Sequence, residues 1–121
     1  GYAYMLRVYS YKGCDSCRKA LKWLRDRDVE FENLAIRETP PNKRELKAVF
    51  ERYEGNLKKL FNISGQDYRS LGLKDKLPEM SEEKAIDLLN SNGNLIKRPF
   101  VIGGKIAEVG FKPDDWESLG F

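Results

Sequence analysis

Two cysteines are the strongest candidates for chemistry in this chain. Cys14 and Cys17 stand three positions apart, after a short apolar run at 5–9, and they open a segment with helical spacing. Free N–H groups and the positive dipole end of a helix start stabilise a thiolate. We therefore predict Cys14 as the nucleophile of a thiol–disulfide redox site. Cys17 falls within the first helical turn and is predicted as the resolving cysteine, which attacks a mixed disulfide formed on Cys14.

Two other interpretations of this pair stay open. Both cysteines could be inert packing residues, because a small apolar side chain suits a core position. They could also be half of a zinc site, although the chain has no histidine and no further cysteine to complete it, so we expect no metal. The lack of histidine also excludes Ser-His-Asp and Cys-His mechanisms. A CxxC pair in a βαβ context is typical of thiol redox proteins, and we favour that interpretation.

Arg98 and Pro99 form the second candidate feature, directly before an apolar run at 100–102. Pro99 could be an ordinary residue at a strand entry, or a cis proline that faces the cysteines. Arg98 could stabilise a thiolate or bind an anionic substrate, and it could equally be a surface arginine. The spacing alone does not decide among these.

The elements that position the cysteines follow from the spacing of apolar residues. Strands are predicted at 5–9 and 31–36. The apolar face of the helix between them comprises Cys17, Ala20, Leu21 and Leu24. A strand, a helix and a strand within about thirty residues form a βαβ unit with a parallel strand pair and a right-handed crossover.

Residues 40–95 are predicted to be a helical insertion. Asn42 and Glu45 have the spacing of a capping box, and Ser81 is expected to cap a later helix. Gly93 fits the left-handed stop of that later helix.

After the insertion the pattern changes to that of strands. Residues 100–102 and 105–109 flank Gly103 and Gly104, which predict a two-residue hairpin turn. Pro113 is expected to open a last short helix. The predicted order is therefore βαβ, a helical middle, then ββα.

Composition bounds the class of protein. With 121 residues, 40% apolar and 34% charged, the chain is expected to form one soluble domain over 1–121. The formal charge of +3 is too small to indicate direct nucleic-acid binding. No apolar run is long enough to span a membrane, and the start has no secretory signal pattern. We expect a cytoplasmic protein, most simply a monomer.

Five motifs carry a family resemblance: 60–62, 68–71, 109–111, Arg98-Pro99, and the run at 9–20 with Gly13-Cys14-Asp15-Ser16-Cys17-Arg18-Lys19-Ala20. They resemble the arsenate reductase-related family, which includes the Spx-type regulators, and the resemblance covers about residues 5 to 116. It implies a thioredoxin-like α/β fold, with a central mixed four-stranded sheet and the insertion at 40–95.

The resemblance also implies roles for single residues. Cys14 matches the family's nucleophile, and Arg98 with a cis Pro99 matches an Arg-Pro motif placed near it. We expect Lys12, Pro99 and Lys112 to contact the substrate.

The chain departs from the family's glutaredoxin-coupled arsenate reductases. Those carry a histidine four residues before the nucleophile, where this chain has Ser10. Of their arginine triad only Arg98 matches, because Asn62 and Lys112 stand at the other two positions. Those reductases also usually lack a cysteine at the position of Cys17.

The cysteine pair is more similar to that of the Spx-type branch. The Spx-type regulators use such a pair as a redox switch and bind the RNA polymerase α subunit. Gly55 matches a glycine of their polymerase-binding face and is our candidate partner contact.

Three functions follow, in order of preference. The first is a thiol–disulfide oxidoreductase with no bound cofactor, which draws electrons from glutathione, thioredoxin or glutaredoxin and acts on a protein disulfide. The second is a redox-switched regulator that binds the RNA polymerase α subunit. The third is a glutathione- and glutaredoxin-dependent arsenate reductase.

Overall fold

A mixed four-stranded sheet organises the protein. The computed structural model describes residues 5–121, so the start of the chain, where no signal is predicted, lies outside the described residues. The strand order is β2-β1-β3-β4. The strands are β1 (Leu6–Ser10), β2 (Phe31–Ala35), β3 (Phe100–Gly103) and β4 (Ile106–Val109). The β1–β2 pair is parallel and the other two pairs are antiparallel, which confirms the predicted mixed sheet.

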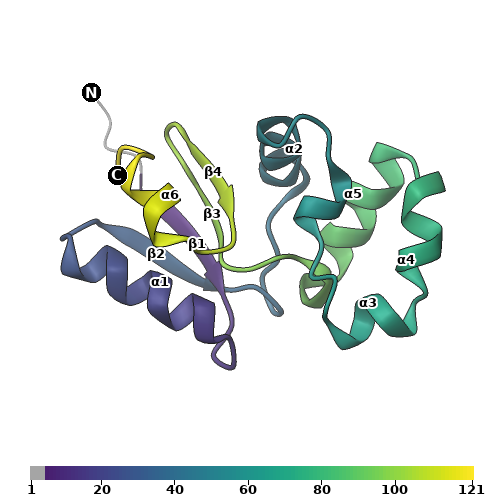
Figure 1. Cartoon of the computed structure of the whole chain (residues 1–121), viewed down its shortest axis with the longest axis horizontal. Coiled ribbons are helices and arrows are strands. Elements are labelled where there is room, and N and C mark those ends of the chain that lie inside the picture. Colours follow the sequence, from purple (N-terminus) through teal and green to yellow (C-terminus); the bar gives the residue numbers. More distant parts are fainter. Residues whose placement is uncertain (1–4) are drawn as a thin grey trace.

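Two helices follow strands of the sheet directly in the sequence. A group of further helices lies between β2 and β3 in the sequence. α1 (Asp15–Asp26) connects β1 to β2, and α6 (Pro113–Glu117) follows β4. The intervening elements are α2 (Lys43–Arg52), η1 (Leu57–Leu60), α3 (Gln66–Ser70), α4 (Leu73–Lys76), η2 (Leu77–Glu79), α5 (Glu82–Ser91) and η3 (Gly93–Leu95). Figure 1 shows α2 to α5 gathered to one side of the sheet, with α1 and α6 at the other.

Alternation along β1 divides the core into two clusters. Leu6 and Val8 face one way and pack with residues of α1 and with Trp116 of α6. Tyr9 faces the other way and packs with Leu46 of α2 and with the helical insertion. The sheet therefore lies between α1 and α6 on one face and α2 with its neighbours on the other.

Local capping signals fix the helix starts as predicted. The Asn42 side chain accepts the N–H of Glu45, while the Glu45 carboxylate accepts the N–H of Asn42, so the capping box is present. The Ser81 side chain accepts the N–H of Lys84 at the start of α5. Each side chain satisfies helix N–H groups that have no partner within the helix.

Two details of the sequence-based prediction were wrong. The hairpin turn lies one residue later than predicted, at Gly104 and Lys105, because Gly103 still pairs with Ile106. Gly93 does not form a left-handed stop, since α5 ends at Ser91 and Gly93 opens η3. Glycine is required there for space, because a Cβ would collide with the backbone carbonyl of Ile36.

A membrane-spanning segment is not found among the described residues 5–121, where every helix is too short or too polar to cross a bilayer.

Candidate active site

Cys14 occupies the N-cap of α1, as the sequence predicts. Its backbone is extended, with φ −98° and ψ 112°, and its side chain accepts a hydrogen bond from the N–H of Cys17. The donor–acceptor distance is 3.2 Å. The sulfur therefore takes the place of the oxygen of an ordinary capping side chain, and a free N–H group of the first turn supports negative charge on it.

Cys17 lies in a different environment from Cys14. Its side chain is 1% exposed, whereas Cys14 is partly exposed, and the two thiols are free. Burial, followed by the hydrogen bond to Cys14, raises the pKa of the Cys17 thiol to about 12. The negative charge of Cys14 acts in the same direction, and Arg98 opposes it. Cys17 is consequently protonated at neutral pH.

Arg98 lines a small cavity together with Cys14. The cavity has a volume of about 370 Å³, and its wall consists of Cys14, Ser16, Asn62, Ser64, Gly65, Lys97 and Arg98. The Arg98–Pro99 peptide bond is cis, which was one of the two alternatives from the sequence. Nη1 of Arg98 is buried and has no hydrogen-bond partner within the described residues. The cavity thus combines a thiol with an arginine that has donor capacity to spare.

Tyr11 holds Arg98 from the side, and sequence reasoning missed it. The guanidinium carbon of Arg98 lies 5.2 Å from the centroid of the Tyr11 ring. That of Arg37 lies 3.7 Å from the same ring. Two guanidinium groups near one tyrosine ring form a cation–π arrangement that restricts both of them. No spacing pattern in the sequence indicates it, because the three residues come from distant segments.

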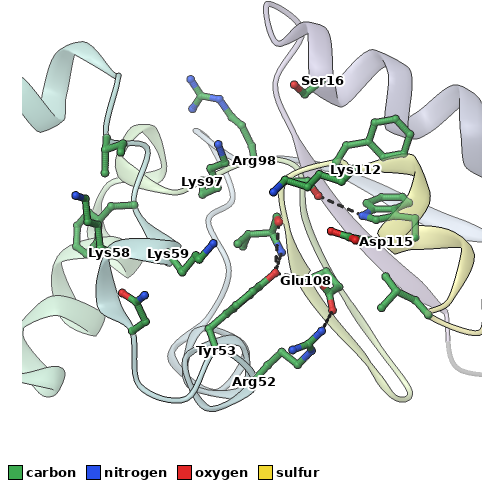
Figure 2. A pocket seen from close by; sticks show the side chains of 18 of the residues that line it. Ser16, Arg52, Tyr53, Lys58, Lys59, Lys97, Arg98, Glu108, Lys112 and Asp115 are labelled. Atoms are coloured by element: carbon green, nitrogen blue, oxygen red, sulfur yellow. Dashed lines mark hydrogen bonds and ion pairs between the residues drawn. The ribbon is translucent and has the colours of Figure 1, made fainter.

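A second, larger hollow adjoins the cysteine cavity. Its volume is about 600 Å³, and it shares Ser16, Lys97 and Arg98 with the smaller cavity. Lys112, a predicted substrate contact, lines this larger hollow and not the cavity that holds Cys14 (Figure 2).

The remaining predicted site residues, Pro99, Lys12 and Gly55, line neither hollow. Pro99 is buried, and its carbonyl accepts the N–H of Gly110 at 2.9 Å. Lys12 is exposed and lines neither hollow, and its carbonyl accepts a hydrogen bond from Arg18. Gly55 is exposed after α2, in a left-handed conformation with φ +81°.

The loop after η1 supplies the far wall of the cysteine cavity. The N–H of Asn62 donates to the carbonyl of Leu95 at 2.7 Å, and that of Lys97 donates to the carbonyl of Leu60 at 2.8 Å. These bonds bring the loop beside the segment that leads to Arg98. Ser64 and Gly65 enter the site in this way, although the sequence marks them only as a turn.

Ser10 does not point its hydroxyl to the cysteines. It is buried, and its hydroxyl donates to Oδ1 of Asn33 at 2.6 Å, across the β1–β2 pair. The side chain that replaces the reductase histidine therefore has a structural hydrogen bond within the sheet.

The fold and the cysteine pair together define a thioredoxin-like α/β protein with its CxxC motif at the start of the first helix. The chain belongs to the ArsC family, whose model matches residues 9–119. It is 49% identical to the uncharacterized protein YusI of Bacillus subtilis (strain 168), over 93% of this chain and 95% of YusI. It is 31% identical to the global transcriptional regulator Spx of Enterococcus faecalis, over 92% of this chain and 83% of Spx.

A solved structure has the same fold over nearly its whole length. The crystal structure of a possible arsenate reductase from Streptococcus mutans UA159 has a TM-score of 0.86 and 40% identity. The match covers 95% of this chain and 99% of that protein. This agreement confirms the predicted fold class.

Proposed function

We propose that the protein is a thiol–disulfide redox protein, with Cys14 as the nucleophile and Cys17 as the resolving cysteine. One observation carries the proposal. Cys14 stands at the N-cap of α1 and opens to a cavity beside Arg98, while Cys17 lies buried directly behind it. Such an asymmetric pair suits a two-step exchange, in which the accessible thiol meets the substrate first.

The exchange begins at Cys14. Its thiolate attacks one sulfur of a substrate disulfide, the substrate S–S bond breaks, and the other sulfur leaves as a thiolate that takes up a proton. Cys17 then gives its proton to solvent and attacks Sγ of Cys14. The Cys14–Cys17 disulfide forms, the substrate leaves with two reduced sulfurs, and two electrons have passed from the protein to the substrate.

The environment of Cys17 changes at the step that needs it. The hydrogen bond and the negative charge of Cys14 both contribute to the raised pKa of Cys17. When Cys14 enters a mixed disulfide, its sulfur no longer carries that charge, so the pKa of Cys17 falls. Burial, the largest cause, remains and keeps Cys17 shielded from external disulfides.

A thiol reductant must restore the pair. Glutathione or a thioredoxin- or glutaredoxin-type protein supplies two electrons and becomes a disulfide itself. Such donors are abundant in the cytoplasm, which is where we place the protein's action.

Trapping the mixed disulfide tests the proposal. In a Cys17→Ser variant, a chromogenic aryl disulfide should leave one aryl thiol bound to Cys14, detected by intact mass. The folded Cys14→Ser variant should bind no aryl thiol. Wild type should release both aryl thiols and end as an internal disulfide. Stable labelling of wild type without internal closure would contradict the resolving role.

A regulatory function is the second candidate. The similarity to Spx extends over 92% of this chain, and Gly55 is exposed on a turn that a partner can reach. The resemblance to Spx-type regulators implies the RNA polymerase α subunit as that partner. Pull-down of this subunit by wild type but not by Gly55→Arg would support the regulator. Equal recovery of the subunit by Gly55→Arg would exclude the surface around Gly55 as the polymerase contact.

A further inference from the structure

The larger hollow has a charge that the redox chemistry at Cys14 does not use. Its wall carries Lys58 and Lys59 of η1, Lys97 and Arg98 before β3, and Lys112 before α6. Within residues 5–121 none of these five side chains forms an ion pair. The cluster is therefore an uncompensated positive surface around a concave site.

The acidic residues of the hollow do not neutralise it. Glu108 is buried and already pairs with Arg52 at 2.7 Å, and it also accepts the Tyr53 hydroxyl at 2.9 Å. Asp115 is the one other carboxylate of the wall. Figure 2 shows Lys59 and Lys112 extending from opposite walls toward the space between them. Positive charge converging on a hollow attracts a ligand with several negative groups.

The position of the hollow relates it to the cysteine. Ser16, Lys97 and Arg98 belong to the walls of both hollows, so a chain that lies in the larger one leads directly to the cavity of Cys14. Arg98 thus carries its charge at the boundary that the two hollows share. Ile63, 47% exposed, adds an apolar contact at the wall.

We propose that the hollow binds an acidic peptide segment of a protein substrate and delivers the adjoining disulfide to Cys14. The inference rests on the proposed redox function and names its substrate class. The volume of about 600 Å³ accommodates several side chains. Lysines at the rim of a binding site raise the association rate of an acidic partner and favour it over a neutral one. This preference for the acidic peptide weakens when salt screens the charges.

Binding of the acidic peptide is measured separately from thiol–disulfide exchange. A fluorescent glutamate-rich peptide without cysteine is compared with its glutamine counterpart by anisotropy, using the full chain. Wild type should bind the acidic peptide about tenfold more tightly than the neutral one, and salt should remove the difference. Lys58→Gln with Lys59→Gln should weaken binding of the acidic peptide about three- to tenfold.

The matched control removes the same charge elsewhere. Lys74 and Lys84 are exposed on α4 and α5 and line neither hollow. Lys74→Gln with Lys84→Gln should bind the acidic peptide as wild type does. Equal weakening by both double variants would overturn the site, because it would reflect net charge alone. Tight binding of S-methylglutathione, in place of the peptide, would overturn the substrate class.

A second measurement separates this inference from the redox proposal. Each peptide is made again with one added cysteine, which is joined to an aryl thiol through a disulfide, and the release of the aryl thiol is timed. Faster release from the acidic peptide, with a lower acidic-to-neutral ratio in the Lys58 and Lys59 double variant, supports both proposals. Equal rates for the two peptides would overturn the docking site alone. Binding without any release would overturn the redox function and leave the binding site standing.

Discussion

Cys14 and Cys17 lie in the first turn of one helix, and their surroundings divide the chemistry between them. Cys14 accepts the N–H of Cys17 at 3.2 Å and is reached from the cavity. Cys17 is 1% exposed, and burial is the main reason that its pKa rises to about 12. The sequence spacing predicts the pair, whereas the degree of burial depends on how α1 packs onto the sheet.

Alkylation should distinguish the two thiols. At about pH 7 only about 10⁻⁵ of Cys17 is thiolate, given the pKa of about 12, so brief iodoacetamide treatment should label Cys14 alone. Peptide mapping by mass spectrometry gives the order of labelling. In urea the two sites should label at similar rates. Earlier labelling of Cys17 in the folded protein would reverse the assigned roles.

Arg98 should set the reduction potential of the pair. Its charge favours the thiolate, which exists only in the reduced form, so removing the charge should make the potential more negative. Arg98→Ala is expected to shift it by about 30 mV, which corresponds to about 1.4 kcal/mol. Arg98→Lys should recover part of the shift, since a lysine keeps the charge without the planar fork.

The potential is measured by equilibration with glutathione redox buffers. Arg44 is exposed on α2, lines neither hollow and forms no ion pair within residues 5–121, so Arg44→Ala is the matched control. Equal potentials in Arg98→Ala and Arg44→Ala would show that Arg98 does not tune the thiols, and that it is either a surface residue or a contact for a partner.

Arsenate turnover should be weak or absent. The cavity of Cys14 offers Asn62 and Arg98, while Lys112 lines the adjoining hollow and Ser10 is held by Asn33. Each missing oriented donor of an oxyanion site commonly costs about 10² or more in rate. Steady-state assays with glutathione and glutaredoxin measure this. Turnover at a rate typical of enzymes would contradict this prediction and promote the arsenate reductase from third to first among the candidate functions.

At the scale of elements, local sequence signals predicted the starts of the helices. They did not predict which segments, distant in the sequence, come into contact. Asn42 and Ser81 cap their helices as expected, because a cap is decided within one turn. The sequence pattern gave the wrong reason for a glycine at position 93. The backbone carbonyl of Ile36, which is far away in the sequence, leaves no room there for a side chain. Tyr11 and Ser64 entered the site unforeseen for the same reason.

Gly93→Ala should test that close approach. The added Cβ meets backbone, which cannot move aside as a side chain can, so we expect a loss of about 3 kcal/mol in the free energy of unfolding. Gly120→Ala is the control, because its Cβ enters open space and only the left-handed φ of +82° costs about 1 kcal/mol. Urea unfolding measures both. Equal costs would mean that η3 shifts freely away from the segment after β2.

At the scale of the whole molecule, the site spans the sheet and the helical insertion. Cys14 is the N-cap of α1, which packs on the sheet, whereas Asn62 and Ser64 belong to the insertion. The carboxylate of Glu108 on β4 fastens the two parts, because it binds Arg52 of α2 and accepts the Tyr53 hydroxyl. This junction was beyond sequence reasoning, since it depends on contacts between residues more than fifty positions apart.

Buried acidic groups in different parts of the fold should make the protein sensitive to alkali. Cys17 has a pKa raised from 9.0 to about 12, and burial also raises the pKa of Tyr9, whose hydroxyl donates to Glu45. Both groups keep their protons in the folded state at a pH where the unfolded chain loses them. The free energy of unfolding is therefore unaffected below about pH 9 by Cys17 and falls above it.

The expected loss from Cys17 is about 1.4 kcal/mol for each pH unit between about 9 and 12, with Tyr9 adding to it above about pH 10. Urea unfolding of the reduced protein at a series of pH values measures the slope. Cys17→Ala should remove the fall that begins near pH 9, and Tyr9→Phe should reduce the part above pH 10. Since Cys17 stands at the start of α1 and Tyr9 faces the insertion, the two contributions should add in the double variant. An unchanged slope in Cys17→Ala would mean that the thiol is hydrated in solution, and its shielding from external disulfides would fail with it.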